Sequence, residues 1–306
     1  MIPTETLFLG PLLVGLAVGL TATFTGVWSA GKIYRFWRKM KWRELPRRER
    51  VKVIFSYSVW AGILACAGDA WLIEPGWVET THVRIPAGRA APLRIVHISD
   101  LHIDAEGEHE KRLAERVNSL RPDVVVMTGD YANAPSGCAA LKRVVGPIQA
   151  AHKVAVLGNW DTPASAEALE EAGFTVLQDG ACELKDERIV IAGLSYRSGK
   201  TVDQIVGASA GLFTIALHHA PEGIERFGAA HPDLFLCGHT HGGQVRLPFY
   251  GAILTMSKFG KKYEAGLYEE GAMRIYVNRG YGVSGAGPRV RFFCRPEITL
   301  IELARP

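Results

Sequence analysis

The sequence predicts an α/β catalytic domain attached to a helical membrane anchor, and three features of the chain lead to that prediction. Short apolar runs rich in Val, Ile and Leu recur between residues 93 and 237, each ended by Gly or a polar residue. Such runs are typical of strands buried on both faces, as in a mostly parallel sheet covered by helices. Before residue 80 the chain instead carries two long apolar stretches with a basic segment between them. We therefore divide it into an anchor, residues 1–80, and one catalytic domain, residues 81–306.

The anchor is expected to contain two hydrophobic helices. The first stretch, Thr6–Gly31, has no charged residue, and its segment Leu7–Trp28 would be about 33 Å long as a helix, enough to cross a bilayer. The second, Val53–Ile73, is nearly as long and carries Asp69 near its end, where an ionisable group can reach the interface. A signal-like or re-entrant helix is the alternative for this second stretch. Turn residues in Glu79–Ala91 suggest a linker to the catalytic domain.

The basic segment predicts the topology of the anchor. All ten Lys and Arg residues of residues 1–80 lie between the two apolar stretches, and Trp37 and Trp42 add aromatic anchors for an interface. Because short basic loops between spans favour the cytoplasm, we expect both termini and the catalytic domain to lie on the extracytoplasmic side. In the alternative topology, the basic segment is an interfacial helix that binds anionic lipid through its Lys and Arg side chains. The whole protein then lies on the cytoplasmic face of the membrane.

Charge also limits the possible partners. Residues 1–80 hold ten basic and six acidic residues, whereas residues 81–306 hold twenty-five of each. Nucleic-acid binding depends on an excess of positive charge, which the catalytic domain lacks. We therefore expect the membrane, but no nucleic acid, among the partners. Five cysteines without a C-x-x-C spacing indicate no disulfide framework.

A polar cluster directly follows each apolar run of the catalytic domain. The carboxyl ends of parallel strands share one edge of a sheet, so we expect these clusters to meet in space. The runs are Leu93–Ile98, Val124–Thr128, Val154–Leu157, Phe213–Leu217 and Leu234–Cys237, and the clusters that follow are Asp100-Leu101-His102, Gly129-Asp130, Gly158-Asn159-Trp160-Asp161, His218-His219-Ala220-Pro221 and Gly238-His239-Thr240-His241.

Carboxylate, imidazole and carboxamide groups in these clusters predict a site for two divalent metal ions. Two ions held about 3.5–4 Å apart need a bridging ligand, and we assign that role to the carboxylate of Asp130. A lone histidine is more often a core or surface residue, but five polar clusters in this order favour a role as metal ligands. Of the two adjacent histidines, His219 is preferred over His218 because it stands two residues before Pro221. One ion is assigned Asp100, His102 and His241, the other Asn159, His219 and His239, and Asp130, Asn159 and His239 are also assigned as catalytic residues.

The predicted site favours a phosphate substrate. Its two ligand carboxylates leave a pair of divalent ions with about two net positive charges, which suits an anionic substrate. A water held between two such ions loses a proton near neutral pH and can attack phosphorus in line. A Ser, Cys or Thr nucleophile is then unnecessary.

Asp-x-His, Gly-Asp, Gly-Asn-x-Asp, His-x-Pro and Gly-His-x-His, in this order within residues 93–303, resemble the calcineurin-like metallophosphoesterase superfamily. The stretch from Gly238 to Pro248 and the ending Arg291–Ile298 are similar to a branch of bacterial membrane-attached or exported phosphodiesterases. The resemblance implies a four-layer α/β/β/α sandwich and Mn, Fe or Zn as the metal. Together with the expected topology of the anchor, it leads us to expect a bacterial inner-membrane location with the domain in the periplasm or at the cell surface.

The chain departs from the family pattern at Trp160, where a histidine commonly protonates the leaving oxygen. An indole N–H does not titrate near neutral pH, so this position offers no general acid. The departure favours a phosphoanhydride or an activated ester, whose leaving group needs least help. A related family that splits UDP-2,3-diacylglucosamine in lipid A synthesis also lacks this histidine. His97 or His152 is an alternative source of the acid.

The predicted function is hydrolysis of a phosphodiester or pyrophosphate, acting on a phosphate-containing small molecule or on a lipid-linked or cell-envelope phosphate. One alternative is a UDP-2,3-diacylglucosamine-type pyrophosphohydrolase, and another is a membrane-bound pseudoenzyme that only binds. Asp161 is either functional or the cap of a helix starting near Pro163. The segment Leu247–Tyr268 is either a lid facing substrate or membrane, or an ordinary loop. Candidate substrate-binding residues are Trp160, Arg279, Arg289 and Arg291.

Overall fold

The structure of the chain is a computed structural model that describes residues 46–88, 90–197, 199–207, 211–228, 231–284 and 289–305. The chain divides into two units, with the boundary between Ala67 and Gly68. The first predicted apolar stretch, Thr6–Gly31, lies outside the described residues. The anchor boundary at residue 80 stays a prediction.

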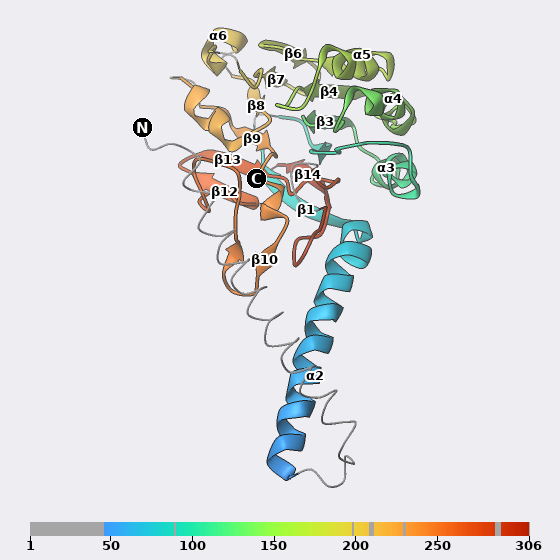
Figure 1. Ribbon diagram of the computed structural model, residues 1–306. Helices are drawn as coiled ribbons and strands as arrows, with labels where there is room; N and C mark the ends of the chain where they lie inside the picture. Colours follow the sequence, from blue (N-terminus) through green and yellow to red (C-terminus); the bar gives the residue numbers. More distant parts are fainter. Residues whose placement is uncertain are drawn as a thin grey trace. The chain divides into compact units, whose positions relative to one another are not determined.

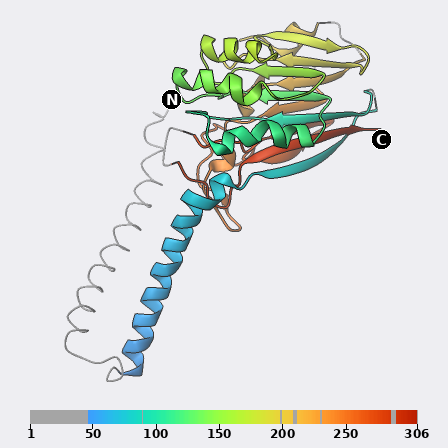
Figure 2. The same cartoon turned by 90° about the vertical axis from the view of Figure 1, so that its right-hand side faces the viewer.

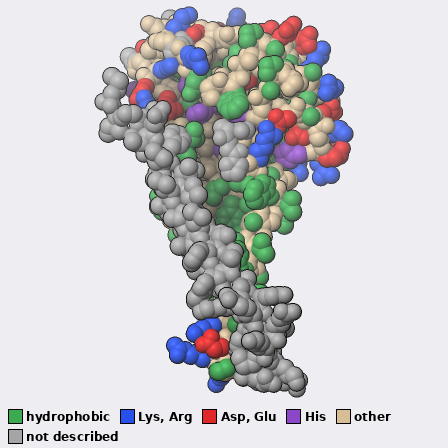
Figure 3. Space-filling view, viewed as in Figure 1, with side chains coloured by type: hydrophobic (Ala, Val, Ile, Leu, Met, Phe, Trp, Pro, Cys, Tyr) green, Lys and Arg blue, Asp and Glu red, His purple; other side chains and the backbone are tan. Residues whose placement is uncertain are grey.

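The second predicted apolar stretch is helical. Helix α2 covers Arg47–Gly68, a π turn Asp69–Ile73 and a 3-10 turn Glu74–Gly76 follow it, and no residue of α2 is buried. Charged side chains gather at the first turn of α2 (Figure 3). The continuous segment Arg47–Gly76 is long and apolar enough to cross a membrane, by length and composition. We call Arg47–Gly76 the candidate span.

Two six-stranded mixed sheets form the second unit (Figure 1). In the first sheet, β2 to β5 run parallel, while β14 lies antiparallel to β2 and parallel to β1. In the second, β7, β8, β9 and β13 run parallel between antiparallel edge strands β6 and β12. The first sheet has the order β1 (Glu79–Pro86), β14 (Glu297–Ala304), β2 (Leu93–Ile98), β3 (Val124–Thr128), β4 (His152–Val156), β5 (Thr175–Val176), and the second the order β12 (Gly266–Glu270), β13 (Met273–Val277), β9 (Leu234–Cys237), β8 (Phe213–Leu217), β7 (Ile189–Gly193), β6 (Gly180–Leu184).

The apolar runs read from the sequence are strands. Four of them coincide residue for residue with β2, β3, β8 and β9, and the fifth overlaps β4. Strands β3 and β9 are buried along their whole length, because helices cover one face of each sheet and the partner sheet covers the other. The linker expected at residues 79–91 is wrong for its first part, since Glu79–Pro86 pairs with β14 as an edge strand.

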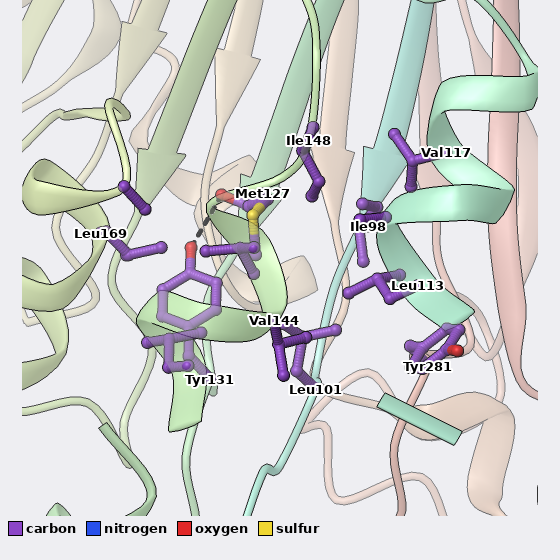
Figure 4. Close-up of a cluster of buried hydrophobic side chains, with 14 of the residues drawn as sticks. Ile98, Leu101, Leu113, Val117, Met127, Tyr131, Val144, Ile148, Leu169 and Tyr281 are labelled. Carbon is purple, nitrogen blue, oxygen red and sulfur yellow. Dashed lines mark hydrogen bonds between the residues drawn. The ribbon is translucent and has the colours of Figure 1, made fainter. Parts of the chain in front are cut away.

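The layers confirm the predicted α/β/β/α sandwich. A central core lies between the sheets, where Ile95 and Val126 of the first pack in one cluster with Ile215 and Leu236 of the second. Helices α3 (Glu108–Ser119), α4 (Cys138–Val145) and α5 (Pro163–Glu171) form a row on the outer face of the first sheet (Figure 2). Figure 4 shows Leu113, Val144 and Leu169 of these helices facing the sheet. On the second sheet, the short helix α6 (Val202–Val206) contributes to a smaller outer cluster.

Candidate metal centre

The loops after the parallel strands converge and are fastened to one another by backbone hydrogen bonds. The N–H of Asp100 donates to the carbonyl of Gly129 at 2.9 Å, and the N–H of His102 donates to the carbonyl of Asp130 at 3.0 Å. Across the two sheets, the N–H of His239 donates to Oδ2 of Asp100 at 3.0 Å. The loops after β2, β3 and β9 therefore form one assembly.

One group of side chains at this junction consists of Asp100, His102 and His241. Nε2 of His102 lies 3.1 Å from Nε2 of His241, and Nε2 of His241 lies 3.3 Å from Oδ1 of Asp100. All three residues are buried, although they come from loops on different sheets. The group therefore offers two imidazole nitrogens and a carboxylate oxygen toward a common point.

A second group consists of Asp130, His219 and His239. Nε2 of His219 lies 3.2 Å from Oδ2 of Asp130 and 3.0 Å from Nδ1 of His239. Oδ2 of Asp130 also lies 3.8 Å from Nε2 of His102. A single carboxylate oxygen thus faces a nitrogen of each group, which is the arrangement that a bridging ligand needs.

The donor atoms fit divalent cations. Oδ1 of Asp100 is buried without a hydrogen-bond partner, and an unpaired buried carboxylate oxygen is costly unless a cation compensates it. Burial by itself lowers the pKa of His219, but the charge and hydrogen bond of Asp130 and the charge of Asp100 outweigh it and raise that pKa to about 9. The carboxylates therefore create a strongly negative site, where a bound cation can take the place of that proton.

Two histidines are held in the tautomer that metal binding requires. Nδ1 of His219 lies 2.7 Å from the carbonyl oxygen of Thr128, and Nδ1 of His102 lies 2.8 Å from Oδ1 of Asn133. Because these oxygens accept, each Nδ1 carries the proton and each Nε2 presents its lone pair to the site. The amide nitrogen of Asn133 also donates to the backbone carbonyl of His102 at 2.7 Å. The sequence pattern did not identify Asn133, although its place three residues after Asp130 was an available signal.

The backbone at the site is held in an unusual conformation. Five of the six residues in the two groups, all except His219, have φ between 47° and 70°, in the left-handed region. Non-glycine residues with such values cluster at functional sites because the surrounding structure must enforce them. Glycine beside the ligands is also required for close packing, since a Cβ on Gly238 would lie 2.2 Å from Oδ2 of Asp100.

Asp161 fastens two of these loops. Its Oδ2 accepts the N–H groups of Gly158 and Asp130, both at 2.8 Å, and its Oδ1 accepts the N–H of Tyr131 at 3.0 Å. Burial and, secondly, the charge of Asp130 raise the pKa of Asp161 to about 6. The helix-cap alternative for Asp161 is wrong, because Thr162 occupies the N-cap position of α5.

Asn159 and Trp160 lie in the loop between these fastened positions. The N–H of Trp160 donates to Oδ1 of Asp130 at 2.9 Å, and its indole lies edge-on to the ring of His102, with centroids 5.7 Å apart. Asn159 is exposed, and its neighbour Gly158 packs against Asp130 so closely that a Cβ would lie 2.2 Å from Oδ1. The loop therefore brings the indole to the first group, and the ligand role of Asn159 remains a prediction.

The other histidines have different surroundings. The ring of His218 stacks on Tyr196 with centroids 5.8 Å apart, and burial lowers its pKa to about 4. His97 is fully buried with Nε2 2.9 Å from Oγ1 of Thr128, and His152 begins β4, at the end of that strand away from the metal ligands. Neither histidine forms a hydrogen bond or ion pair with a residue of the two groups, and a general-acid role for either stays a prediction.

The three candidate arginines have partners within the protein. Arg279 pairs with Glu79 at 2.9 Å and with Glu297 at 3.2 Å, and the exposed Arg289 pairs with Asp104. Arg291 is fully buried and donates to backbone carbonyls, including that of Arg279 at 2.9 Å. In this structure all three support the loop architecture, and their predicted contact with phosphate remains untested.

The sandwich and its paired Asp/His groups define a class of protein, the metal-dependent phosphoester hydrolases. Residues 93–247 match the family profile of the calcineurin-like phosphoesterase superfamily domain, and the chain belongs to this superfamily. It is 32% identical to the uncharacterized metallophosphoesterase YkuE of Bacillus subtilis, over 85% of this chain and 98% of YkuE.

Two further relatives carry more specific names. The chain is 32% identical to phosphodiesterase YaeI of Escherichia coli, over 75% of this chain and 90% of YaeI. It is 26% identical to UDP-2,3-diacylglucosamine pyrophosphatase LpxG of Chlamydia trachomatis, over 69% of this chain and 83% of LpxG. The protein is thus a phosphoester hydrolase, and it resembles relatives named for both diester and pyrophosphate cleavage.

Proposed function

We propose that this protein is a membrane-attached phosphohydrolase with a binuclear metal centre that cleaves a phosphodiester or a phosphoanhydride. The observation that carries the proposal is the position of Oδ2 of Asp130, 3.8 Å from Nε2 of His102 and 3.2 Å from Nε2 of His219. Two divalent cations, of which Mn, Fe and Zn are the candidates, would activate a water molecule and neutralise the phosphoryl oxygens. The ligands would be Asp100, His102, Asp130, Asn159, His219, His239 and His241.

The residues of the chain hold and orient this centre. Asn133 and the carbonyl of Thr128 fix the tautomers of His102 and His219, and Asp161 holds the loop of Asp130. The indole of Trp160 covers one side of His102 and cannot exchange a proton near neutral pH. The leaving oxygen must therefore depart with little protonation by this residue, which favours phosphate or phenolate leaving groups.

A lipid-linked or cell-envelope phosphate is the substrate class that we favour. Its support is the candidate span, which would hold the catalytic unit at a membrane, together with the similarity to LpxG. UDP-2,3-diacylglucosamine-type pyrophosphate cleavage is the specific alternative. A binding-only pseudoenzyme is less consistent with the intact donor groups. We place the domain on the extracytoplasmic side of the bacterial inner membrane.

Metal content and turnover of the purified full-length protein test this function. We expect two divalent ions per chain and hydrolysis of bis(p-nitrophenyl) phosphate or of a nucleotide pyrophosphate. The Asp130→Asn variant should lose most of its bound metal and most of its hydrolytic activity, because both ions share this ligand. Asp186→Asn, an exposed carboxylate in the turn after β6, is the matched control and should retain both. Two ions and normal turnover in Asp130→Asn would contradict the assignment.

A further inference from the structure

The segment that follows His241 carries an unusually exposed apolar surface. It forms a hairpin of β10 (Arg246–Leu247) and β11 (Gly251–Ala252). Phe249 at its tip has no protein cover at all, with an exposed fraction of 111%. Exposed groups of large apolar side chains usually mark a surface that binds a protein, a membrane or a ligand. We call the exposed side chains here the apolar rim, and its members are Leu247, Phe249, Tyr250, Ile253, Leu254, Met256 and Phe293.

Phe293 connects the apolar rim with the start of the catalytic unit. It lines a pocket of about 420 Å³ with hairpin residues such as Leu247 and Tyr250. It also lines a pocket of about 310 Å³ with Glu74 and Trp77. The hairpin and the end of the candidate span therefore lie on one side of the catalytic unit, where Figure 3 shows green side chains around the hairpin.

Hydrogen bonds fix this arrangement. The carboxylate of Glu74 accepts the N–H of Phe293 at 2.8 Å and also the N–H of Cys294. The N–H of Arg291 donates to the carbonyl of Ala70 at 3.0 Å. Between these tied positions the chain exposes Trp71, Leu72 and Ile73, which extend the apolar surface.

The charges beside the hairpin are compensated within the protein. Lys258 pairs with Glu225, Lys262 with Glu270 at 2.7 Å, and Arg246 with Glu264 at 2.8 Å. The ammonium of Lys261 lies 3.6 Å from the ring centre of Tyr250. The guanidinium of Arg295 likewise lies 3.7 Å from the ring centre of Trp77. Aromatic rings beside cations are typical of residues at a membrane interface, and paired charges do not select a charged partner.

We infer that the apolar rim docks onto the bilayer interface as a second membrane contact, in addition to the candidate span. The inference rests on the membrane attachment in the proposed function. The hairpin is joined to the metal centre, since Oγ1 of Thr240 donates to the carbonyl of Glu264 at 2.8 Å and the carboxylate of Glu264 accepts the N–H of Ala252. Docking would therefore hold the metal centre next to the headgroup layer, which suits a phosphate carried on a lipid.

Spin labels on the full-length protein in phosphatidylcholine nanodiscs test this inference. Phe249→Cys carries the label, in a background where Cys66 and Cys182 are replaced by serine. Lys185→Cys, in the exposed turn after β6, is the matched control. We expect the ratio of oxygen accessibility to nickel-chelate accessibility to be several-fold higher at position 249 than at 185. Equal ratios at the two positions would overturn the inference.

Two further readouts separate the alternatives. Dipolar broadening between labels at position 249 of two chains would assign the apolar rim to a second copy of the protein and overturn membrane docking. Metal content and hydrolysis of a soluble aryl phosphodiester are measured on the same labelled proteins. Loss of catalysis is therefore recorded independently of membrane contact, and a failure of the proposed chemistry is distinguishable from a failure of docking.

Discussion

Asn133 holds His102 by two hydrogen bonds of opposite direction. Its Oδ1 lies 2.8 Å from Nδ1 of the imidazole, and its amide nitrogen donates to the carbonyl of the same residue at 2.7 Å. The contact joins the loop after β2 to the loop after β3. Asn133 therefore fixes both the ring orientation and the proton position of a candidate ligand.

Asn133→Ala should lower metal affinity about 10- to 100-fold, the usual cost of removing such a support from a ligand histidine. Isothermal titration calorimetry of the purified protein with the metal measures the change in affinity. Asn118→Ala is the matched control, because that asparagine also bonds two backbone groups but lies at the end of α3 away from the site. Unchanged affinity in Asn133→Ala would show that His102 needs no such support or is not a ligand.

Trp160 should make the rate depend steeply on the leaving group. Without a general acid, turnover falls as leaving-group pKa rises, because negative charge on the departing oxygen stays uncompensated. Trp160→His should raise the turnover of substrates with poor leaving groups by about 100-fold or more and make this dependence shallower. The measurement is log kcat against leaving-group pKa for a series of aryl phosphodiesters at saturation. Trp77→His, outside the metal centre, serves as the control, and a flat dependence in the native enzyme would refute the idea.

The basic segment between the apolar stretches should lie in the cytoplasm. An impermeant maleimide added to intact cells should label Asp186→Cys in the catalytic domain but not Arg43→Cys, in a background without Cys66 and Cys182. Labelling of Arg43→Cys after permeabilisation shows that this thiol is reactive. The opposite pattern in intact cells would support the cytoplasmic, lipid-gripping alternative.

His97 should reduce stability at acid pH. Burial lowers its pKa from 6.5 to about 3 against the opposing charge of Glu297, so the folded state keeps the ring neutral while the unfolded state protonates. Stability then falls by about 1.4 kcal/mol per pH unit as pH decreases below the unfolded value. The titratable groups facing the ring are Tyr276 on β13 and Glu297 on β14, which are bonded to each other.

The expected result for His97→Gln is a smaller fall of the thermal unfolding midpoint between pH 6.5 and pH 4.5. Differential scanning calorimetry of the detergent-solubilised protein measures the midpoint at each pH. His152→Gln, which replaces a partly exposed histidine, should keep the native pH dependence. An identical fall in His97→Gln and the native protein would show that the neutral buried ring makes no such contribution.

Local sequence was sufficient to predict the strands that carry the site. Runs such as Val124–Thr128 are apolar up to a final threonine and are followed by a glycine, so the pattern itself defines a strand buried on both faces and its carboxyl end. The linker prediction failed at Glu79–Pro86 because its alternating residues form an edge strand only through pairing with β14, more than 200 residues later in the sequence.

The composition of each ligand cluster was also visible in the sequence, but its geometry was not. The order of Asp, His and Asn residues predicted which side chains gather, and the structure brings six of the seven into two groups. The sequence pattern could not predict that Asn133 orients His102, that Asp161 holds the loop of Asp130, or that Arg291 is buried.

Local sequence patterns were therefore enough to predict the strands, the chemical types of the candidate ligands and the two apolar stretches of the predicted anchor. The tautomers of the histidines, the ion pairs of the arginines and the exposure of the apolar rim became visible only in the folded structure. Hydrophobic periodicity depends on neighbouring residues, whereas the direction of a hydrogen bond depends on the register between strands that are distant in sequence. The 139 residues that separate Asp100 from His239 carry no local signal of the hydrogen bond between them.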